Sequence, residues 1–467
     1  MQVQLASPRL LRSYSPSPSA SLPLVKSHAE ESLGANPGDA ALNPADSVAM
    51  GVPSARAPKG SPPVARPGLF SAIRHRAFRL LFISFLINQT GFWISHISLQ
   101  GLTVELTHND TRQSGFLFFA LFVPAFAFAP IAGVVADRLD RKRIVLSCYL
   151  SVAILTAVLA WLTNAGEISP PMLLAIAFGM GMAFAFSGPA SMAIAANSVP
   201  RDDLSSAVSL QSAANNLTRV VGPLLAAPMV ATSRFEISFT LYAAAATVAA
   251  ILTAMMKIER YAPDAEEGGL FARIRGGFEH AKKRKPALPA LLTVATLSFF
   301  GVSHVVLLPA FAQDVLGDPS MFAWIVAVTG VGAMAGALSV GRSSRAPTLR
   351  GAAFGVAAFG LSLGLFAATG SIVLALASQL VLGYFYFAVM TGLQTLIQEV
   401  VDETKRGRVM SLFQVCWAGL IPFGSLLLGY LAAPLGAPTT LMAAAGICVL
   451  YGCAMAWLAP RWERSEG

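Results

Sequence analysis

The chain has 467 residues, of which 55% are hydrophobic and only 12% are charged, and its formal net charge is +9. A soluble domain carries about 25% charged residues, so the composition excludes an ordinary soluble domain and favours a membrane protein. The positive charge by itself would suggest nucleic-acid binding, but its placement in the chain argues against that class.

The first seventy residues are rich in Ser, Pro, Ala and Gly and show no apolar period. Such a segment cannot bury a core, so we expect residues 1–70 to be a disordered cytoplasmic tail. Residues 20–25 are too short and too interrupted for a signal sequence. Met50 offers a later start, and the sequence does not separate a late start from a functional tail.

After this tail, mostly apolar stretches recur that are long enough to cross a bilayer as helices. The sequence therefore predicts an all-α membrane protein with twelve transmembrane helices in two pseudo-symmetric six-helix bundles. The predicted spans are 78–104, 114–136, 144–163, 171–195, 204–230, 236–256, 287–312, 320–341, 351–369, 371–398, 409–433 and 436–459.

The two halves repeat their landmarks. His96 and Glu105 in the first span parallel His304 and Asp314 in the seventh. A repeat of about two hundred residues with six spans in each half is typical of a two-bundle transporter. The predicted divisions are an N-terminal bundle over 71–256, a cytoplasmic linker over 257–286, a C-terminal bundle over 287–459 and a cytoplasmic tail over 460–467.

Lys and Arg gather in the loops on one side of the predicted spans. Four lie between 138 and 143 and six between 273 and 285, whereas the opposite loops hold Arg112 and Arg234. This is the positive-inside bias of membrane proteins. It predicts that both termini and the linker are cytoplasmic, and it assigns the excess charge to topology rather than to nucleic acid.

The loop between the second and third spans, Asp137–Lys142, is dense in both signs of charge. An Asp there can accept hydrogen bonds from helix N-termini, and its basic neighbours can pair with carboxylates or helix C-termini. We expect a cytoplasmic latch that breaks when the halves rock, with a glycine that lets the next span approach closely. The alternative is that these charges only fix topology. The candidate latch residues are Gly133, Asp137, Arg138, Arg141 and Lys142.

The fifth span contains Gly222-Pro223, and a Gly-Pro pair inside a span breaks the helix ladder and kinks it. Arg219 precedes this pair and is the permanently charged residue that lies deepest in the predicted membrane region. Such a residue is costly and marks function by default. It could bind an anionic substrate or lock a carboxylate. The alternative is that its head snorkels to the cytoplasmic face.

His96 and His304 are the other buried ionisable residues, at matching places in the two halves. Histidine titrates near neutrality, so a pair that faces the central cavity could carry a proton. Glu105 and Asp314 lie further out, as candidates for proton entry or as exposed loop charges. A neutral, hydrogen-bonded histidine inside the packing is the alternative.

The four cysteines, Cys148, Cys416, Cys448 and Cys453, lie within or beside predicted spans. Their spacing indicates neither a zinc site nor a disulfide framework. No G-x-x-x-x-G-K-[ST] loop is present, so direct use of ATP is not expected. We expect no metal, no cofactor and no catalytic residue.

The Asp137 loop resembles the loop between helices 2 and 3 of the major facilitator superfamily of transporters, which reads roughly G-x-x-a-D-R-x-x-R-[KR]. Residues 70–459 are most similar to the exporter branch that includes the enterobactin exporter and macrolide efflux proteins. The other residues that carry this resemblance are Asn88–Ile94, Glu105–Thr107, Pro124, Val199–Arg201, Leu204, Gly222–Pro223 and Arg406–Ser411.

The chain departs from these relatives at two places. Phe92 stands where many of them carry an acidic residue, which shifts the expected proton site to Glu105 and the histidines. Ala226-Ala227 stands where the Gly-Pro motif of drug–proton antiporters is usually followed by Gly-Gly.

The resemblance implies a secondary active transporter of the plasma or bacterial inner membrane that works by alternating access. The sequence favours proton-coupled export of an amphipathic drug- or siderophore-class molecule, with membrane lipid and protons as further partners and a monomeric state. The expected cavity is lined by aromatic residues such as Phe92, Trp93, Phe385 and Tyr386. A nutrient or lipid-related permease of the same fold is the alternative. A polytopic membrane enzyme would need a catalytic cluster at one membrane face, which the sequence does not show.

Overall fold

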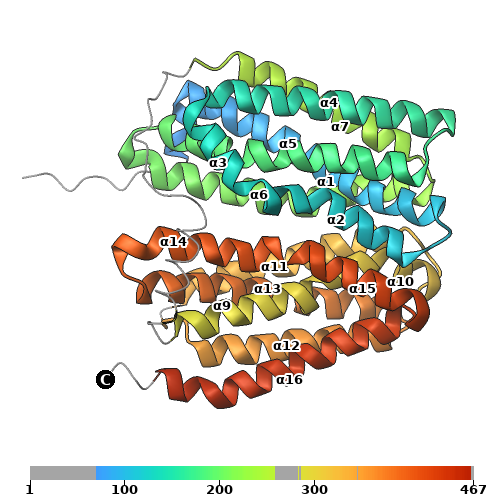
Figure 1. Cartoon of the computed structure of the whole chain (residues 1–467), viewed down its shortest axis with the longest axis vertical. Coiled ribbons are helices and arrows are strands. Elements are labelled where there is room, and N and C mark those ends of the chain that lie inside the picture. Colours follow the sequence, from blue (N-terminus) through green and yellow to red (C-terminus); the bar gives the residue numbers. More distant parts are fainter. Residues whose placement is uncertain (1–69, 258–281, 283–285, 344, 464–467) are drawn as a thin grey trace, which may run out of the picture. The chain divides into compact units, whose positions relative to one another are not determined.

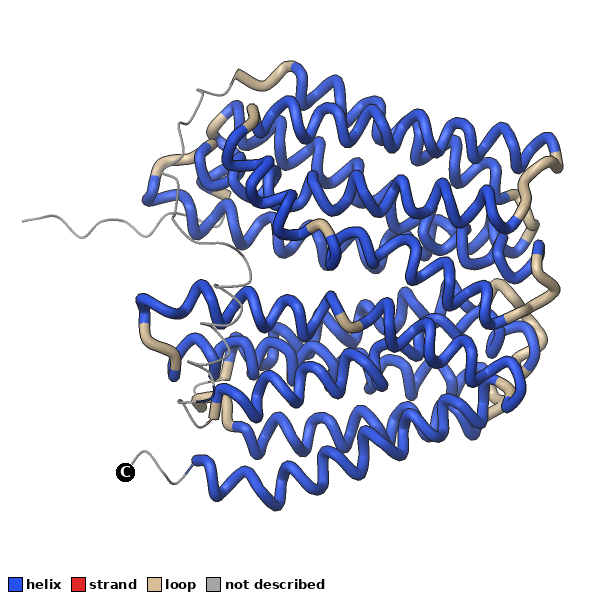
Figure 2. The backbone as a smooth tube through the Cα atoms, in the orientation of Figure 1, coloured by secondary structure: helices blue, strands red, loops and turns tan. Residues whose placement is uncertain are grey.

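The computed structural model describes residues 70–257, 282, 286–343 and 345–463, and the ordered elements within this part are all helices (Figures 1 and 2). All these residues belong to one compact unit of the chain. The predicted all-α fold is therefore confirmed. The predicted tail over 1–70 and most of the linker over 257–286 lie outside the described residues, and the domain boundaries stay predictions.

The N-terminal half begins with a short 3-10 helix, Ser71–Arg74, and continues in long helices that follow the predicted spans. These helices are α1 (Arg76–Leu106), α2 (Thr111–Ala127), α3 (Ala129–Arg138), α4 (Arg141–Ala165), α5 (Pro170–Asn197), the 3-10 helix η2 (Arg201–Asp203), α6 (Leu204–Ala231) and α7 (Phe235–Ala254).

The C-terminal half contains two short π-helices, η3 (Leu297–Gly301) and η5 (Val415–Gly419), which contact each other. The π-helix is rare and is often found at functional sites. The other elements are α9 (Ala287–Thr296), the 3-10 helix η4 (Val302–Leu307), α10 (Leu308–Asp314), α11 (Met321–Arg342), α12 (Leu349–Ala368), α13 (Ile372–Val400), α14 (Glu403–Gln414), α15 (Ile421–Leu435) and α16 (Ala437–Glu463).

Ten helical stretches in the described part of the chain are long and apolar enough to cross a membrane. The second predicted span is divided at Phe128, because Pro130 in the first turn of α3 can start a helix but lacks the N–H to continue one. The fifth span, α6, is not among these ten stretches and includes Asn215, Asn216 and Arg219. Helix occupies each predicted span, while the count of twelve membrane crossings stays a prediction.

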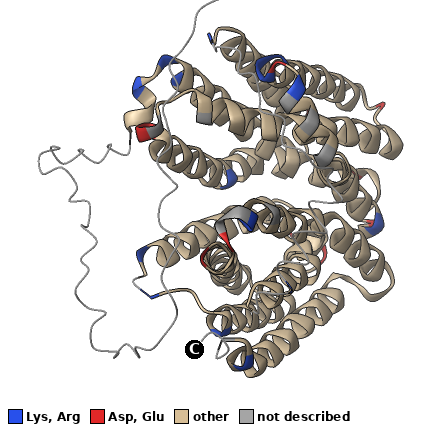
Figure 3. Cartoon of the chain, turned by 60° about the vertical axis from the view of Figure 1, so that its left-hand side comes forward, with Lys and Arg blue, Asp and Glu red and all other residues tan. Residues whose placement is uncertain are grey.

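The helices form two packed groups, α1 to α7 and α9 to α16, which appear as an upper and a lower layer in Figure 1. Within the groups α4 packs on α7, α1 on α7 and α6, α12 on α16, and α11 on α13. The halves meet along two helix pairs, α2 with α15 and α6 with α11. Lys and Arg lie mainly at helix ends and in loops (Figure 3).

The Gly222–Pro223 pair lies inside helix α6 and affects both its hydrogen bonds and its packing. Helix α6 continues through the pair, from Leu204 to Ala231, and the predicted kink stays a prediction. Pro223 removes one hydrogen bond, because it has no N–H to donate to the carbonyl of Arg219 one turn earlier. Gly222 permits close packing, because a Cβ there would collide with the Cβ of Trp93 on α1. The motif thus brings α1 against α6.

We expect Gly222→Ala to lower the midpoint of thermal unfolding in detergent, because the Trp93 Cβ is fixed to its backbone and α1 must move away. Overpacking of this kind costs about 1–3 kcal/mol. Gly188→Ala in α5 is the matched control, since a Cβ there meets nothing within 4 Å and Ala favours helix. Equal midpoints for the two variants would contradict the close-packing role of Gly222.

Candidate functional site

Arg219 lies between aromatic rings that come from both halves of the chain. The central carbon of its guanidinium is 5.4 Å from the ring centre of Trp93 on α1 and 5.0 Å from that of Phe387 on α13. All three residues stand near the middle of long helices. This position supports a charge held inside the membrane region rather than the snorkelling alternative.

The two rings offset only part of the cost of this charge. A cation–π contact contributes about 0.5–2 kcal/mol depending on desolvation. An arginine at the centre of a membrane helix costs at least about 2.5–3.5 kcal/mol. The Arg219 Nε is buried and has no hydrogen-bond partner, and among the described residues no carboxylate forms an ion pair with Arg219. Water or an anion must supply the remaining stabilisation.

Other hydrogen-bond donors surround this guanidinium. Trp417 in η5 donates from Nε1 to the Tyr386 hydroxyl at 2.6 Å, so the phenol proton is available for another acceptor. Tyr386 directly precedes Phe387, whose ring contacts Arg219, on α13. The indole N–H of Trp93 is buried and has no partner. We call Arg219, Trp93, Tyr386, Phe387 and Trp417 the junction site.

His96 is enclosed by aromatic rings and is only 4% exposed. The Phe92 ring stacks on it at 5.7 Å, and Phe118 and Phe122 contact it edge-on at 5.3 and 5.6 Å. Its Nε2 is 3.1 Å from the amide nitrogen of Gln100, while its Nδ1 is buried and has no partner. The Trp93 ring contacts His96 at 5.6 Å as well as Arg219. One indole therefore separates these two ionisable groups.

His304 is 2% exposed and lies in η4. Its Nδ1 is 2.7 Å from the carbonyl of Gly301, and its Nε2 is 3.5 Å from the amide nitrogen of Gln379 on α13. Each histidine thus has a glutamine at Nε2 and contacts residues of its own half. The expectation that the pair faces a central cavity is wrong for this conformation, because packing encloses both rings.

Glu105 and Asp314 are both exposed, at the end of the molecule predicted to be external. Ser233 donates to Glu105 at 2.7 Å, and Asn109 donates to Asp314 at 2.7 Å across the two halves. Asn109 and Ser233 have positive φ angles of 65° and 53°, which are uncommon for residues other than glycine. These two turns therefore hold the side chains of Asn109 and Ser233, which donate to Asp314 and Glu105.

The two halves are closely packed at this same end. Thr111 at the start of α2 donates to the carbonyl of Gly429 on α15 at 2.8 Å. A Cβ at Gly115 would lie 3.2 Å from the Cα of Leu426. At the opposite end, α3 packs on α5, and α14 packs on α9 and α13, within their own halves. Two hydrogen bonds between the halves, Asn109–Asp314 and Thr111–Gly429, therefore lie at the predicted outer end.

In the charged loop, the described bonds stay within the N-terminal half. Asp140 caps α4 by accepting from the backbone of Lys142 at 3.0 Å. Lys142 Nζ donates to the carbonyls of Ala254 and Met256, both at 2.7 Å, and so caps the end of α7. Arg141 Nε donates to the Ala136 carbonyl at 3.1 Å. The predicted pairing of a basic residue with a helix C-terminus is present, although the helix belongs to the same half.

The other three latch candidates are Asp137, Arg138 and Gly133. The side chain of Asp137 lies outside the described residues, and Arg138 is exposed. The expected role of Gly133 in close packing is wrong, because a Cβ built there meets nothing within 4 Å. Helix α3 packs mainly on α5 rather than on the following span, α4.

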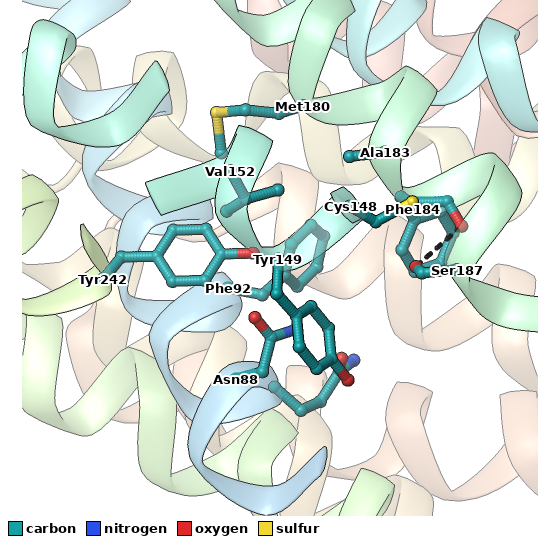
Figure 4. A pocket seen from close by; sticks show the side chains of 11 residues that line it. Asn88, Phe92, Cys148, Tyr149, Val152, Met180, Ala183, Phe184, Ser187 and Tyr242 are labelled. Carbon is teal, nitrogen blue, oxygen red and sulfur yellow. Dashed lines mark hydrogen bonds between the residues drawn. The ribbon is translucent and has the colours of Figure 1, made fainter. Parts of the chain in front are cut away.

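A pocket with about 330 Å³ of empty volume lies inside the N-terminal half, between α1, α4, α5 and α7 (Figure 4). Phe92 forms part of its wall and thus lies between the pocket and His96. The Asn88 Oδ1 is buried there without a partner. The pocket is lined by Asn88, Gln89, Phe92, Cys148, Tyr149, Val152, Met180, Ala183, Phe184, Ser187 and Tyr242.

The residues predicted to line the cavity are divided between two places. Phe92 borders the pocket, whereas Trp93 and Tyr386 belong to the junction site. Phe385 is partly buried and its ring pairs with Tyr384 at 5.3 Å. Phe387 and Trp417 were not singled out from the sequence, because an aromatic residue in an apolar span carries no local signal of its partner.

Residues 81–425 match the family model described as the Major Facilitator Superfamily. The staphyloferrin A transporter of Staphylococcus aureus (strain NCTC 8325 / PS 47) is 26% identical over 372 residues, which cover 77% of this chain and 91% of that protein. The enterobactin exporter EntS of Shigella flexneri is 26% identical over 364 residues, which cover 77% of this chain and 86% of that protein.

A solved structure of a bacterial homologue of the human lysosomal transporter Spinster, in an inward-facing and unoccupied conformation, has a TM-score of 0.66 to this chain. The alignment covers 86% of this chain and 98% of that one, at 16% identity. At this identity the likeness shows the fold alone.

We expect Lys142→Met to loosen the last turn of α7, because the variant keeps the apolar stem and loses both bonds to carbonyls. A cation at a partly exposed helix C-terminus contributes about 1 kcal/mol, which corresponds to roughly fivefold faster local opening. Hydrogen exchange of the amides of Met255 and Met256 measures this change. Arg143→Gln is the control, since that side chain is 77% exposed. Unchanged exchange in Lys142→Met would contradict the capping role.

Proposed function

Because this chain belongs to the major facilitator superfamily, and is thus an integral membrane transporter rather than an enzyme, we propose that it exports an amphipathic small molecule by proton-coupled alternating access. The observation that carries this proposal is the junction site, where one partly buried charge contacts rings from both halves. In two-bundle transporters the substrate site lies near the midplane, between the repeats. The names of the two relatives, a siderophore transporter and a siderophore exporter, support a substrate of the siderophore or drug class.

The contacts between the halves support a rocking mechanism. The bonds Asn109–Asp314 and Thr111–Gly429 hold the predicted outer end together, while α3 and α14 pack within their own halves. Rigid-body rocking would break the outer bonds and bring the cytoplasmic ends together, where Asp137, Arg138 and Arg141 would form the latch. Asp314 then acts as an outer-gate residue as well as a candidate for proton entry.

For the driving force we propose that His96 and His304 carry the proton, and the structure gives each of them a different set of possible acceptors. A protonated histidine donates from both ring nitrogens, so each needs an acceptor. The Gln100 Oε1 is buried without a partner, and rotation of its amide would present this oxygen to His96. The Gln379 Oε1 already accepts from Thr329 at 3.0 Å, so the same rotation beside His304 costs a bond. At Nδ1 the order is reversed, because His304 has the Gly301 carbonyl as an acceptor at 2.7 Å and His96 has no partner there. Trp93 contacts both His96 and Arg219. Protonation of His96 and binding of substrate at Arg219 would therefore both act on the Trp93 side chain.

The placement of charge supports a defined orientation. Basic residues gather at the end that holds the α3–α4 loop (Figure 3), so the positive-inside rule puts both termini and the linker in the cytoplasm. We propose the plasma membrane or bacterial inner membrane as the location, and a monomer as the working unit.

An uptake permease is the second candidate. It is favoured by the pocket in Figure 4, whose polar side chains, including Asn88, Gln89 and Ser187, suit a small polar nutrient. The direction of transport separates the two candidates.

Expression of the chain in a bacterial strain that lacks its main efflux pumps should raise resistance to at least one compound of an amphipathic panel. A protonophore should abolish that resistance, because export draws on the proton gradient. The measurement is the minimal inhibitory concentration, together with the compound accumulated in cells. Increased accumulation on expression would instead support uptake.

In reconstituted vesicles with an imposed pH gradient, His96→Gln combined with His304→Gln should abolish uphill export while downhill exchange persists. His108→Gln, in an exposed turn, is the control and should export normally. Full uphill export by the double variant would place the proton path elsewhere, and Glu105 would be the next residue to test.

A further inference from the structure

We propose that the junction site binds an organic carboxylate that carries a planar aromatic ring, with Arg219 as its anchor. The inference rests on the proposed transport function in naming the substrate class of the same site. Binding can be measured without transport, so the two ideas can fail separately.

The first argument is the missing counter-ion. Every acidic residue in the described part of the chain stands near a helix end or in a loop, as Glu105, Asp203, Asp314 and Glu399 illustrate. Arg219 lies near the middle of α6, one turn before Gly222. No described carboxylate of the protein therefore shares its depth. A negative charge that complements Arg219 at this depth would therefore come from a ligand.

The second argument is the chemistry of the site's polar groups. Arg219 Nε and Trp93 Nε1 are buried donors without acceptors. The Tyr386 hydroxyl accepts from Trp417, which leaves its own proton to donate. An ionised carboxylate is acceptor-only, with two oxygens that can take several such bonds. A neutral amide or an amine would bring donors to a site that has donors already.

The third argument is the shape of the walls. The rings of Trp93 and Phe387 contact the guanidinium carbon from two helices and supply no lone pair, so they do not take up the N–H groups directionally. Trp417 contacts the Phe387 ring at 6.5 Å and extends the aromatic surface. Aromatic side chains pair well with flat ring systems by offset or edge contacts. A planar aromatic acid fits this surface better than an alkyl chain does.

The test compares two probes of nearly equal size on the purified full-length protein in lipid nanodiscs. Naphthalene-1-carboxylate carries the proposed charge, and naphthalene-1-carboxamide lacks it. Isothermal titration calorimetry should show the acid binding at least about tenfold more tightly than the amide, which corresponds to about 1.4 kcal/mol. Arg219→Gln should bring this ratio close to one.

Two further variants keep the test decisive. Arg234→Gln removes an exposed arginine from the α6–α7 turn and should leave the ratio unchanged. Trp93→Phe keeps a ring and the Cβ that packs on Gly222 but removes the N–H, and it should weaken acid binding about threefold without affecting the amide. This variant remains informative if Arg219→Gln does not fold.

The proposal is overturned by a ratio near one in the wild-type protein, by an unchanged ratio in Arg219→Gln, or by the absence of saturable naphthalene-1-carboxylate binding. Charge-selective binding without any export would uphold this inference and refute the transport proposal. Export of neutral or cationic compounds, with no carboxylate binding, would uphold the transport proposal and refute this inference.

Discussion

A permanent positive charge near the middle of a membrane helix, without a described carboxylate at the same depth, is the constraint on which the centre of this molecule depends. Aromatic rings from α1 and α13 contact this charge, and a set of hydrogen-bond donors lies near it. Those groups stabilise the cation in part and leave it able to attract an anion. The two halves meet around this charge, so their relative position and the occupancy of the site depend on each other.

The sequence from Arg219 to Pro223 works as one unit of α6. Gly222 and Pro223 follow Arg219 by three and four residues, so all three lie on one face of the helix. Gly222 brings the backbone of α1 close enough for Trp93 to reach the guanidinium. Pro223 leaves the Arg219 carbonyl without its usual donor. A motif that looks like a helix breaker therefore serves mainly to bring two helices together.

The two ends of the molecule are held in different ways. At the predicted outer end, Asn109 and Thr111 make hydrogen bonds from one half to the other. At the charged end, Lys142 and Asp140 stabilise helix termini of their own half. Bonds within a half persist when two rigid bodies rock, whereas bonds between halves must break and reform. This difference suits a transporter that opens by rearranging contacts between its halves.

The histidines illustrate how context changes the meaning of a residue. Their matching positions in the repeats suggested a pair, and each does have a glutamine at Nε2. The enclosure of His96 by Phe92, Phe118 and Phe122 is a property of packing, and it removes the ring from any open cavity. The free oxygen of Gln100 distinguishes His96 from His304, and only the side-chain positions reveal it.

The sequence by itself determined the class of protein, the positions of the helices and the family. These follow from local properties: apolar segments of membrane length, charges confined to loops, and the motif that includes Asp137. It also identified Arg219 as unusual, because a permanent charge inside a long apolar segment can be recognised from the sequence alone. The tertiary structure decided which residues meet. It placed Phe387 and Trp417 at the junction site, bonded Lys142 to the end of α7, and left open space beside Gly133. Residues far apart in the chain meet only through helix packing, and packing is a property of the whole fold that no local pattern encodes.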